Sequence, residues 1–323
     1  MNFLVDHGAI LFAYGRTFTV ANKKVRWSGQ FRVQNLWNDR TAQPWSADVD
    51  NSGTVFLQQR KTPGERQFIL CSTFSLKAQD PPSAESAGAS NAGPYGDFIH
   101  DLDRSVGQIF AALEKQNALE NTLIIFTSDN GGVINPGSKT GASKIAMDAG
   151  LKINGALRGG KHDIWEGGFK VPFLVRWPGR VPAGTTSHET IGVVDIFSTV
   201  AAVSGEPKLD RTTTAPDSVN VLPAFLGRPS AQPLRRDLIL QSASGVYAIL
   251  SGPWKWVDGV PLAPKGKKAP AATGAKAEQF RSRLVNLTDD PAEVHDVSAA
   301  HPDIVKRLAE TLSAHRAQGF SRE

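Results

Sequence analysis

Two apolar runs separated by an amphipathic segment limit the folds that are open to this chain. Residues 67–74 have the length and composition of a buried strand, and residues 123–127 form a second run of the same kind. Between them, apolar residues recur at three- and four-residue steps from Gly96 to about Asn117, which predicts a helix that packs one side against a core. A further run at 173–177 predicts another strand. The order of strand, helix and strand is typical of α/β folds with a parallel sheet.

The rest of the pattern divides the chain into three predicted parts. Residues 1–65 alternate between polar and aromatic stretches and contain no motif to which we can assign a chemistry. Residues 66–235 form a predicted α/β core, and residues 236–323 form a smaller C-terminal unit. Near the end of the core we expect a helix that begins with Asp195 as its N-cap and is stopped by Gly205.

The C-terminal unit has a different pattern. Short strand candidates follow one another without helices between them at 238–240, 246–250 and 254–257, which predicts an antiparallel sheet. A helix at 302–315 then closes the chain, with its apolar residues on one face.

Composition excludes several classes of protein. The 323 residues are 40% hydrophobic, which is enough for a large core, and the net charge of +5 is spread along the chain. We therefore expect no nucleic-acid partner. The single cysteine, Cys71, excludes an internal disulfide and a cysteine-rich zinc site. The N-terminus does not resemble a signal peptide, and no run reaches the roughly 18 apolar residues of a membrane-spanning helix, so we expect no membrane partner.

Polar residues follow directly after the predicted strand at 123–127. The sequence at 128–132 is Ser-Asp-Asn-Gly-Gly, and in open parallel sheets the ligand crevice lies beyond the carboxyl ends of the strands. The carboxylate of Asp129 and the amide oxygen of Asn130 are hard donors that suit Ca²⁺ or Mg²⁺, and the glycines allow the backbone to approach closely. From these residues alone, an ordinary Asn-Gly turn is the favoured alternative.

A second concentration of glycine and polar residues lies at 157–172. Two glycine pairs flank Lys161 and His162, as suits a tight loop around an anion. The ammonium group of Lys161 is suited to bind sulfate or phosphate oxygens and His162 to donate a proton, although an ordinary surface loop accounts for the pair as well. Glu166 is either a further ligand or a residue that caps the loop backbone.

Taken together and in this order, these segments resemble the sulfatase family. The matching segments lie at 93–97 and the helix after it, 127–132, 157–161, 165–168, 171–172, 176–179 and 194–199, with the tail agreeing at 248–255 and 284–293. The resemblance implies an alkaline-phosphatase-like α/β fold, with a mixed or parallel sheet core that is incomplete at the N-terminus and a small C-terminal antiparallel sheet plus helix. It also implies an enzyme, a sulfuric-ester hydrolase of the arylsulfatase type that acts on a sulfated small molecule or glycan.

The resemblance also assigns roles to residues. In this family a cysteine within Cys-x-Pro-x-Arg is converted to formylglycine, whose hydrate attacks the sulfur, while a divalent ion, usually calcium, polarises the sulfate. By motif, Asp129 and Asn130 are then two ligands of Ca²⁺ or Mg²⁺, and Lys161 binds the sulfate oxygens. His162 is a further catalytic candidate. Lys77 stands where the family has histidines that contact the sulfate, although lysine is a poorer proton donor at neutral pH.

Cys71 departs from the family pattern, because no proline follows it after two residues and no arginine after four. We therefore expect Cys71 in the core, no formylglycine site in this sequence, and a chain that corresponds to the downstream part of a longer sulfatase. Two alternatives stay open: a non-catalytic module that binds sulfated or phosphorylated ligands, and a phosphatase or phosphodiesterase of the same superfamily. Family members are mostly periplasmic, secreted or lysosomal, and this sequence does not select among these compartments.

Overall fold

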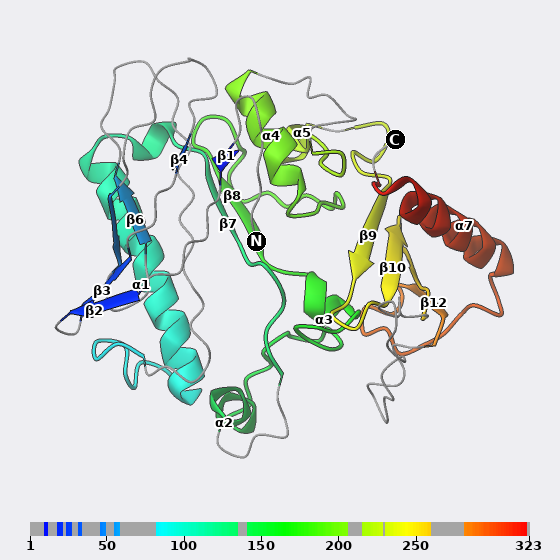
Figure 1. Ribbon diagram of the computed structural model, residues 1–323, viewed down its shortest axis with the longest axis horizontal. Coiled ribbons are helices and arrows are strands. Elements are labelled where there is room, and N and C mark those ends of the chain that lie inside the picture. The colour runs from blue at the N-terminus through cyan, green and yellow to red at the C-terminus, as the bar shows by residue number, and fades with distance from the viewer. Residues whose placement is uncertain are drawn as a thin grey trace. The chain divides into compact units, whose positions relative to one another are not determined.

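The computed structural model describes residues 82–134, 141–205, 215–228, 230–259 and 281–321, together with the backbone of the short strands between Ile10 and Gln58 (Figure 1). The predicted strand at 67–74, with Cys71, and the candidate Lys77 lie outside the described residues. The chain divides into two compact units, Met1–Ala112 with Gly137–Leu151, and Leu113–Pro136 with Lys152–Glu323. Within the described residues no helix combines the length and apolarity needed to cross a membrane.

The described part of the first unit contains short antiparallel strand pairs and helices. Its strands are β1 (Ile10–Leu11), β2 (Phe18–Ala21), β3 (Lys24–Trp27), β4 (Arg32–Val33), β5 (Ser46–Val49) and β6 (Val55–Gln58), paired as β1 with β4, β2 with β3 and β5 with β6. Its helices are α1 (Gly93–Lys115), whose last residues belong to the second unit, and α2 (Ala142–Asp148). The helix predicted over 96–117 is confirmed.

The buried side of α1 is more polar than the apolar spacing predicts. Ile99, on the predicted core side, is 48% exposed, whereas Asp97 and Asp101 are buried. The Asp97 carboxylate accepts backbone hydrogen bonds from Gly88 (2.9 Å) and Ser90 (2.8 Å), and these bonds hold the pKa of Asp97 below its usual range. These carboxylates thus bind α1 to the loop before it, which is why polar positions are the buried ones.

In the second unit, the end of α1 is followed by the 3₁₀ turn η1 (Leu119–Asn121) and strand β7 (Ile124–Thr127), which confirms the strand predicted at 123–127. β7 pairs antiparallel with β8 (Phe173–Arg176), with Ile124 opposite Arg176. The described pairing is therefore antiparallel, as a mixed sheet allows, while the predicted parallel partner at 67–74 lies outside the described residues. Two further helices are α4 (Asp195–Ser204) and α5 (Leu222–Phe225).

Asp195 occupies a different position on α4 from the one predicted. The N-cap is Val194, and Asp195 is the first helical residue, so the predicted cap is wrong by one position. The carboxylate of Asp195 instead accepts from the backbone N–H groups of Gly192 (2.7 Å) and Val219 (2.8 Å) and pairs with the buried guanidinium of Arg235, whose Nε lies 3.0 Å away. Both carboxylate oxygens of Asp195 are thus bound to partners outside α4 and do not cap its first turn. Gly205 ends the helix with a left-handed φ of 96°, as predicted.

The C-terminal sheet has the strand order β12–β11–β10–β9, with every neighbouring pair antiparallel (Figure 1). Its strands are β9 (Asp237–Gln241), β10 (Tyr247–Ser251), β11 (Trp254–Val257) and β12 (Arg283–Asn286), and α7 (Pro302–Gln318) packs against it. Leu308 and Leu312 of α7 share a buried cluster with Ile249, Trp256 and Leu284. The predicted antiparallel sheet and terminal helix are confirmed.

A buried ion-pair network joins this sheet to α3 (Glu166–Phe169). The Lys255 side chain on β11 is completely buried, and its Nζ lies 2.9 Å from Glu166 Oε1 and 2.7 Å from Glu293 Oε1. Glu293 Oε2 also accepts the backbone N–H of Glu166 at 2.6 Å. Burial raises the pKa of Glu293, and the Lys255 ammonium opposes that rise. Because buried charges are tolerated only when paired, these contacts fix the start of α3 on the sheet.

Lys255→Met is expected to lower the free energy of unfolding by about 3–5 kcal/mol, because it leaves two buried carboxylates without their cation. Urea unfolding followed by circular dichroism measures the change. Lys306→Met, at an exposed position on α7, is the matched control and is expected to change stability by less than about 0.5 kcal/mol. Equal effects of the two substitutions would contradict the assigned role of Lys255.

Glu293 gives a second prediction, on pH dependence. A raised pKa means that the folded chain holds this proton more tightly than the unfolded chain. The contribution of Glu293 to stability is therefore fully present below its ordinary pKa of 4.5 and is lost as the pH rises through the raised value. Glu293→Gln removes this titration. In urea unfolding at a series of pH values, the stability of the wild type minus that of the variant is expected to fall as the pH increases, and a flat difference would show that the pKa is not raised.

Candidate functional site

The loop after β7 lies against the glycine-rich segment at 158–168. The backbone N–H of Gly131 donates to Gly168 O (2.9 Å), and the N–H of Lys161 donates to Gly132 O (3.1 Å). A Cβ on Gly131 would lie 1.7 Å from the carbonyl oxygen of Gly167, so only glycine allows this approach. The two motifs that the sequence analysis singled out are thus adjacent in space.

The segment at 158–168 is held at several points. Arg158 places its guanidinium 3.9 Å from the centre of the Trp165 ring and donates to Glu293 O at 2.7 Å. Asp163 Oδ2 accepts the N–H of Gly160 at 3.0 Å, which closes the turn around Lys161. His162 has a φ of 83°, an uncommon value for a residue with a side chain, and its carbonyl accepts the N–H of Ala243 at 3.2 Å. The loop that carries Lys161 and His162 is therefore anchored to the C-terminal sheet.

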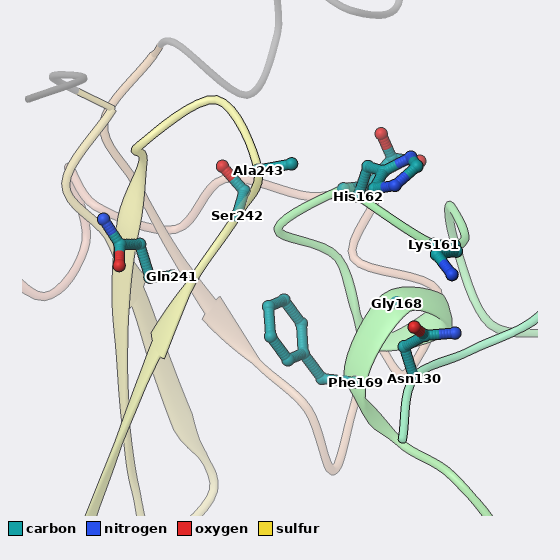
Figure 2. Close-up of a pocket in the computed structure, with 9 residues that line it drawn as sticks. Asn130, Lys161, His162, Gly168, Phe169, Gln241, Ser242 and Ala243 are labelled. Carbon is teal, nitrogen blue, oxygen red and sulfur yellow. The ribbon is translucent and has the colours of Figure 1, made fainter. Parts of the chain in front are cut away.

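An open cavity of about 180 Å³ lies beside this loop (Figure 2). Its lining residues come from the β7 loop, the 158–168 segment, α3 and the turn after β9, and they are Asn130, Lys161, His162, Asp163, Gly168, Phe169, Gln241, Ser242 and Ala243. Three of the predicted site residues, Asn130, Lys161 and His162, thus face one space. Asp129 is exposed and is not among the described residues that line the cavity, and Lys77 lies outside the described part of the chain.

The sequence analysis did not predict several of the residues that line the cavity. Phe169 follows the glycine pair, but an aromatic residue there is as readily a core residue. Gln241 ends β9, and residues 242–243 begin the turn to β10; all three are far along the chain from Lys161, so no motif spacing links them to it. Glu166, left open between a ligand and a backbone cap, instead binds the buried ammonium group of Lys255.

Asp129 and Asn130 offer the chemistry of a hard divalent cation. The Asn130 amide nitrogen donates to Gly131 O at 3.0 Å, which leaves its Oδ1 to act as an acceptor or ligand, and the Asp129 carboxylate is exposed. Calcium takes about six to eight oxygen ligands, so these two supply only part of a coordination shell. Over the described ranges no group of three or more His, Cys, Asp or Glu residues is arranged to hold a metal. The donor types fit Ca²⁺ or Mg²⁺, with further ligands required.

Comparison with curated proteins identifies several sulfatases that are similar to this chain. An N-acetylgalactosamine-6-O-sulfatase of Bacteroides thetaiotaomicron is 32% identical over 284 residues, which cover 86% of this chain and 52% of the relative. The N-acetylgalactosamine-6-sulfatase of Homo sapiens is 29% identical over 288 residues, 82% of this chain and 52% of that protein. A steryl-sulfatase of Rattus norvegicus is 39% identical over 185 residues, 55% and 29% respectively. The chain spans about half the length of the N-acetylgalactosamine-6-sulfatases it matches.

Solved structures also resemble this chain. A structure described under the metabolism of multiple glycosaminoglycans by Bacteroides thetaiotaomicron superposes with a TM-score of 0.61 at 31% identity, covering 73% of this chain and 47% of that one. A sulfatase of Pseudoalteromonas sp. gives 0.56 at 24% identity, covering 74% and 46%, and shows the likeness of the fold alone. The chain therefore has the alkaline-phosphatase-like α/β fold of these structures.

The model of the Sulfatase family matches residues 6–206, so the likeness also covers most of the segment at 1–65 to which we had assigned no motif. This range contains both loops that meet at the cavity, with Asn130 on one and Lys161 on the other. On this match, and on its likeness to the relatives and structures above, the chain belongs to the sulfatase family.

Proposed function

We propose that this chain serves the hydrolysis of a sulfate ester, with the cavity beside Lys161 as the place where the sulfate binds. The observation that carries the proposal is that Asn130 and Lys161, from two separate segments, line one space in a member of the sulfatase family. The fixed backbone contacts between Gly132 and Lys161, and between Gly131 and Gly168, support it, because a preorganised site needs rigid neighbours.

Lys161 is the residue proposed to bind the sulfate oxygens. When the S–O bond of the ester breaks, negative charge moves toward the leaving oxygen, and a nearby ammonium group stabilises that charge. His162 is exposed at the rim of the same cavity and is proposed as a proton donor to the leaving group. The only cysteine, Cys71, lies in Cys-Ser-Thr-Phe-Ser, which is not the Cys-x-Pro-x-Arg pattern of the family's formylglycine site.

Asp129 and Asn130 are proposed to hold Ca²⁺, or Mg²⁺, together with ligands beyond this pair. A bound divalent cation supplies Lewis-acid polarisation of a sulfate oxygen. The chain's own part is to present a carboxylate and an amide oxygen at the end of β7, next to the loop of Lys161. The amide orientation of Asn130, set by its hydrogen bond to Gly131 O, suits this role.

The substrate is proposed to be a sulfated sugar. Two of the relatives compared above act, by their names, on N-acetylgalactosamine-6-sulfate, and each aligns over more than four fifths of this chain. The steryl-sulfatase aligns over a shorter stretch, 55% of this chain. N-acetylgalactosamine-6-sulfate is therefore the ligand with which the site is best tested.

The absence of a Cys-x-Pro-x-Arg segment from this sequence favours one second candidate function, a module that binds sulfated ligands without turnover. Release of inorganic sulfate from the ligand, measured alongside binding, distinguishes the two. A phosphatase is the least favoured function, because it would need a hydroxyl nucleophile at the cavity. Ser242 is the hydroxyl residue among the described lining residues, and its Oγ already pairs with Ser244 Oγ (2.9 Å) and accepts the N–H of Val246.

Lys161→Ala is expected to weaken binding of N-acetylgalactosamine-6-sulfate about 10- to 100-fold, since a hydrogen bond to a charged group contributes about 1.5–3 kcal/mol. Isothermal titration calorimetry on the whole chain measures this change. Lys152→Ala removes the same charge from an exposed position outside the described cavity lining and is expected to leave affinity within about twofold. Wild-type affinity in Lys161→Ala would refute the sulfate-binding role.

Asp129→Asn is expected to weaken Ca²⁺ binding by about tenfold or more, because it replaces a charged ligand by a neutral one while keeping its shape. Titration with Ca²⁺, followed by calorimetry and by the rise in thermal midpoint, gives the affinity. Asp103→Asn, at an exposed position on α1, is the charge-matched control. If both variants bind Ca²⁺ as the wild type does, Asp129 is not a ligand.

A further inference from the structure

We propose that Asn154 is a positioning residue of the sulfate site, whose side-chain amide holds the loop of Asn130 and the loop of Lys161 in one fixed arrangement. This inference rests on the proposed function, in which Asn130 helps to hold a divalent cation and Lys161 binds the sulfate. It adds a residue that is not among the described lining residues of the cavity and acts through the residues that are.

The amide of Asn154 forms hydrogen bonds to both loops. Its Oδ1 accepts the backbone N–H of Gly132 at 2.8 Å, and its Nδ2 donates to Gly132 O at 3.2 Å and to Gly159 O at 2.8 Å. A side-chain amide has two donor hydrogens and one acceptor oxygen, so each of its polar groups is used. The two glycines lie two residues after Asn130 and two residues before Lys161. The amide therefore links the loops close to the residues proposed to bind the cation and the sulfate.

The same amide is packed closely against the loop of Lys161. A Cβ added to Gly160 would lie 3.0 Å from Asn154 Nδ2 and 2.5 Å from Gly132 O, so there is no room for a side chain between these groups. The backbone carbonyl of Asn154 accepts the N–H of Leu157 at 3.1 Å, which closes a turn just before the loop. Asn154 is partly buried, so water competes less for its hydrogen bonds than it would at an open surface.

The loop after β7 reaches the surface directly after Gly132, where Val133 and Ile134 are 46% and 40% exposed. Up to this point the loop is joined to the segment of Lys161 by the backbone hydrogen bonds described above. The Asn154 amide adds bonds to both the N–H and the C=O of Gly132, so neither peptide group can rotate without breaking one of them. Without the amide, the end of the loop could shift relative to Lys161.

A fixed arrangement of the two loops has a consequence for binding. A divalent cation and a sulfate that bind beside one another attract, and the strength of this attraction depends on the distance between them. Each therefore increases the affinity for the other by the same factor. Loss of the Asn154 amide is expected to reduce this factor, whereas Asn130 and Lys161 each keep their own binding groups.

The test measures, by isothermal titration calorimetry, the affinity of the whole chain for N-acetylgalactosamine-6-sulfate with saturating Ca²⁺ and with a chelator in its place. In the wild type, Ca²⁺ is expected to tighten binding about tenfold or more. In Asn154→Ala this factor is expected to fall to about threefold or less, while the affinity without Ca²⁺ stays within about twofold of the wild type. Lys161→Ala, by contrast, is expected to weaken binding in both conditions.

Two further variants separate positioning from a general loss of structure. Asn154→Asp keeps the acceptor for the N–H of Gly132 but loses both donors, so it is expected to lose the coupling as well and serves as the test if Asn154→Ala does not fold. Asn121→Ala, at an exposed position in η1, is the matched control and is expected to keep the wild-type coupling. The thermal midpoint of each variant shows that it is folded.

The possible results distinguish this inference from the proposed function. The positioning role is refuted if the Asn154 variants keep the wild-type coupling, or if they weaken binding equally with and without Ca²⁺. Failure of the wild type to bind the sugar sulfate, or a wild-type affinity that Ca²⁺ does not change, would instead refute the proposed function itself.

Discussion

The ion-pair network of Lys255 with Glu166 and Glu293 is the constraint on which the site depends. A completely buried ammonium group between two carboxylates is stable only if all three groups keep their positions, because any gap leaves an unpaired charge in a medium of low polarity. Glu166 is also the first residue of α3, whose backbone contacts the loop of Asn130. Buried charges between α3 and the C-terminal sheet thereby set the geometry at the cavity.

The Lys161 loop is held by further contacts of other kinds, within the loop and to the C-terminal sheet. Arg158 stacks on Trp165 and donates to the carbonyl of Glu293, and the carbonyl of His162 accepts from Ala243. The left-handed backbone of His162 lies between two residues whose backbone N–H groups are bonded, Lys161 to Gly132 O and Asp163 to Gly160 O, which holds this uncommon conformation in place. The small antiparallel sheet is therefore a support for the site as well as a closing unit of the chain.

Local patterns in the sequence predicted much of the fold. The helix α1, the strand β7, the antiparallel order of β9, β10 and β11 and the face of α7 that carries Leu308 all follow from spacing over a few residues, which is the range at which hydrophobic periodicity acts. The placement of Asn130 after β7 followed from the rule for strand ends, and the cavity includes it together with Lys161 and His162.

What the sequence did not predict depends on pairs that are distant along the chain. Glu166 is separated along the chain by 89 residues from Lys255 and by 127 residues from Glu293, whose carboxylate accepts its N–H. No local sequence pattern therefore predicts either pairing. From the sequence Trp-Lys-Trp, Lys255 would be expected on the exposed side of a strand. In the structure Lys255 is buried, and its charge is balanced by carboxylates in the core. Asp195 was misplaced by one residue for the same reason, since its partner Arg235 comes from another segment.

The close packing of glycines between the two loops has a consequence for how such a site can diverge. Side chains cannot be added at Gly131 or Gly167 without collision with backbone atoms, so substitutions there are disfavoured by geometry alone. The exposed positions Gln241 and Ala243 face no such restriction. Related proteins that share these glycine contacts are therefore free to differ in the residues of the β9–β10 turn, which lines the same cavity.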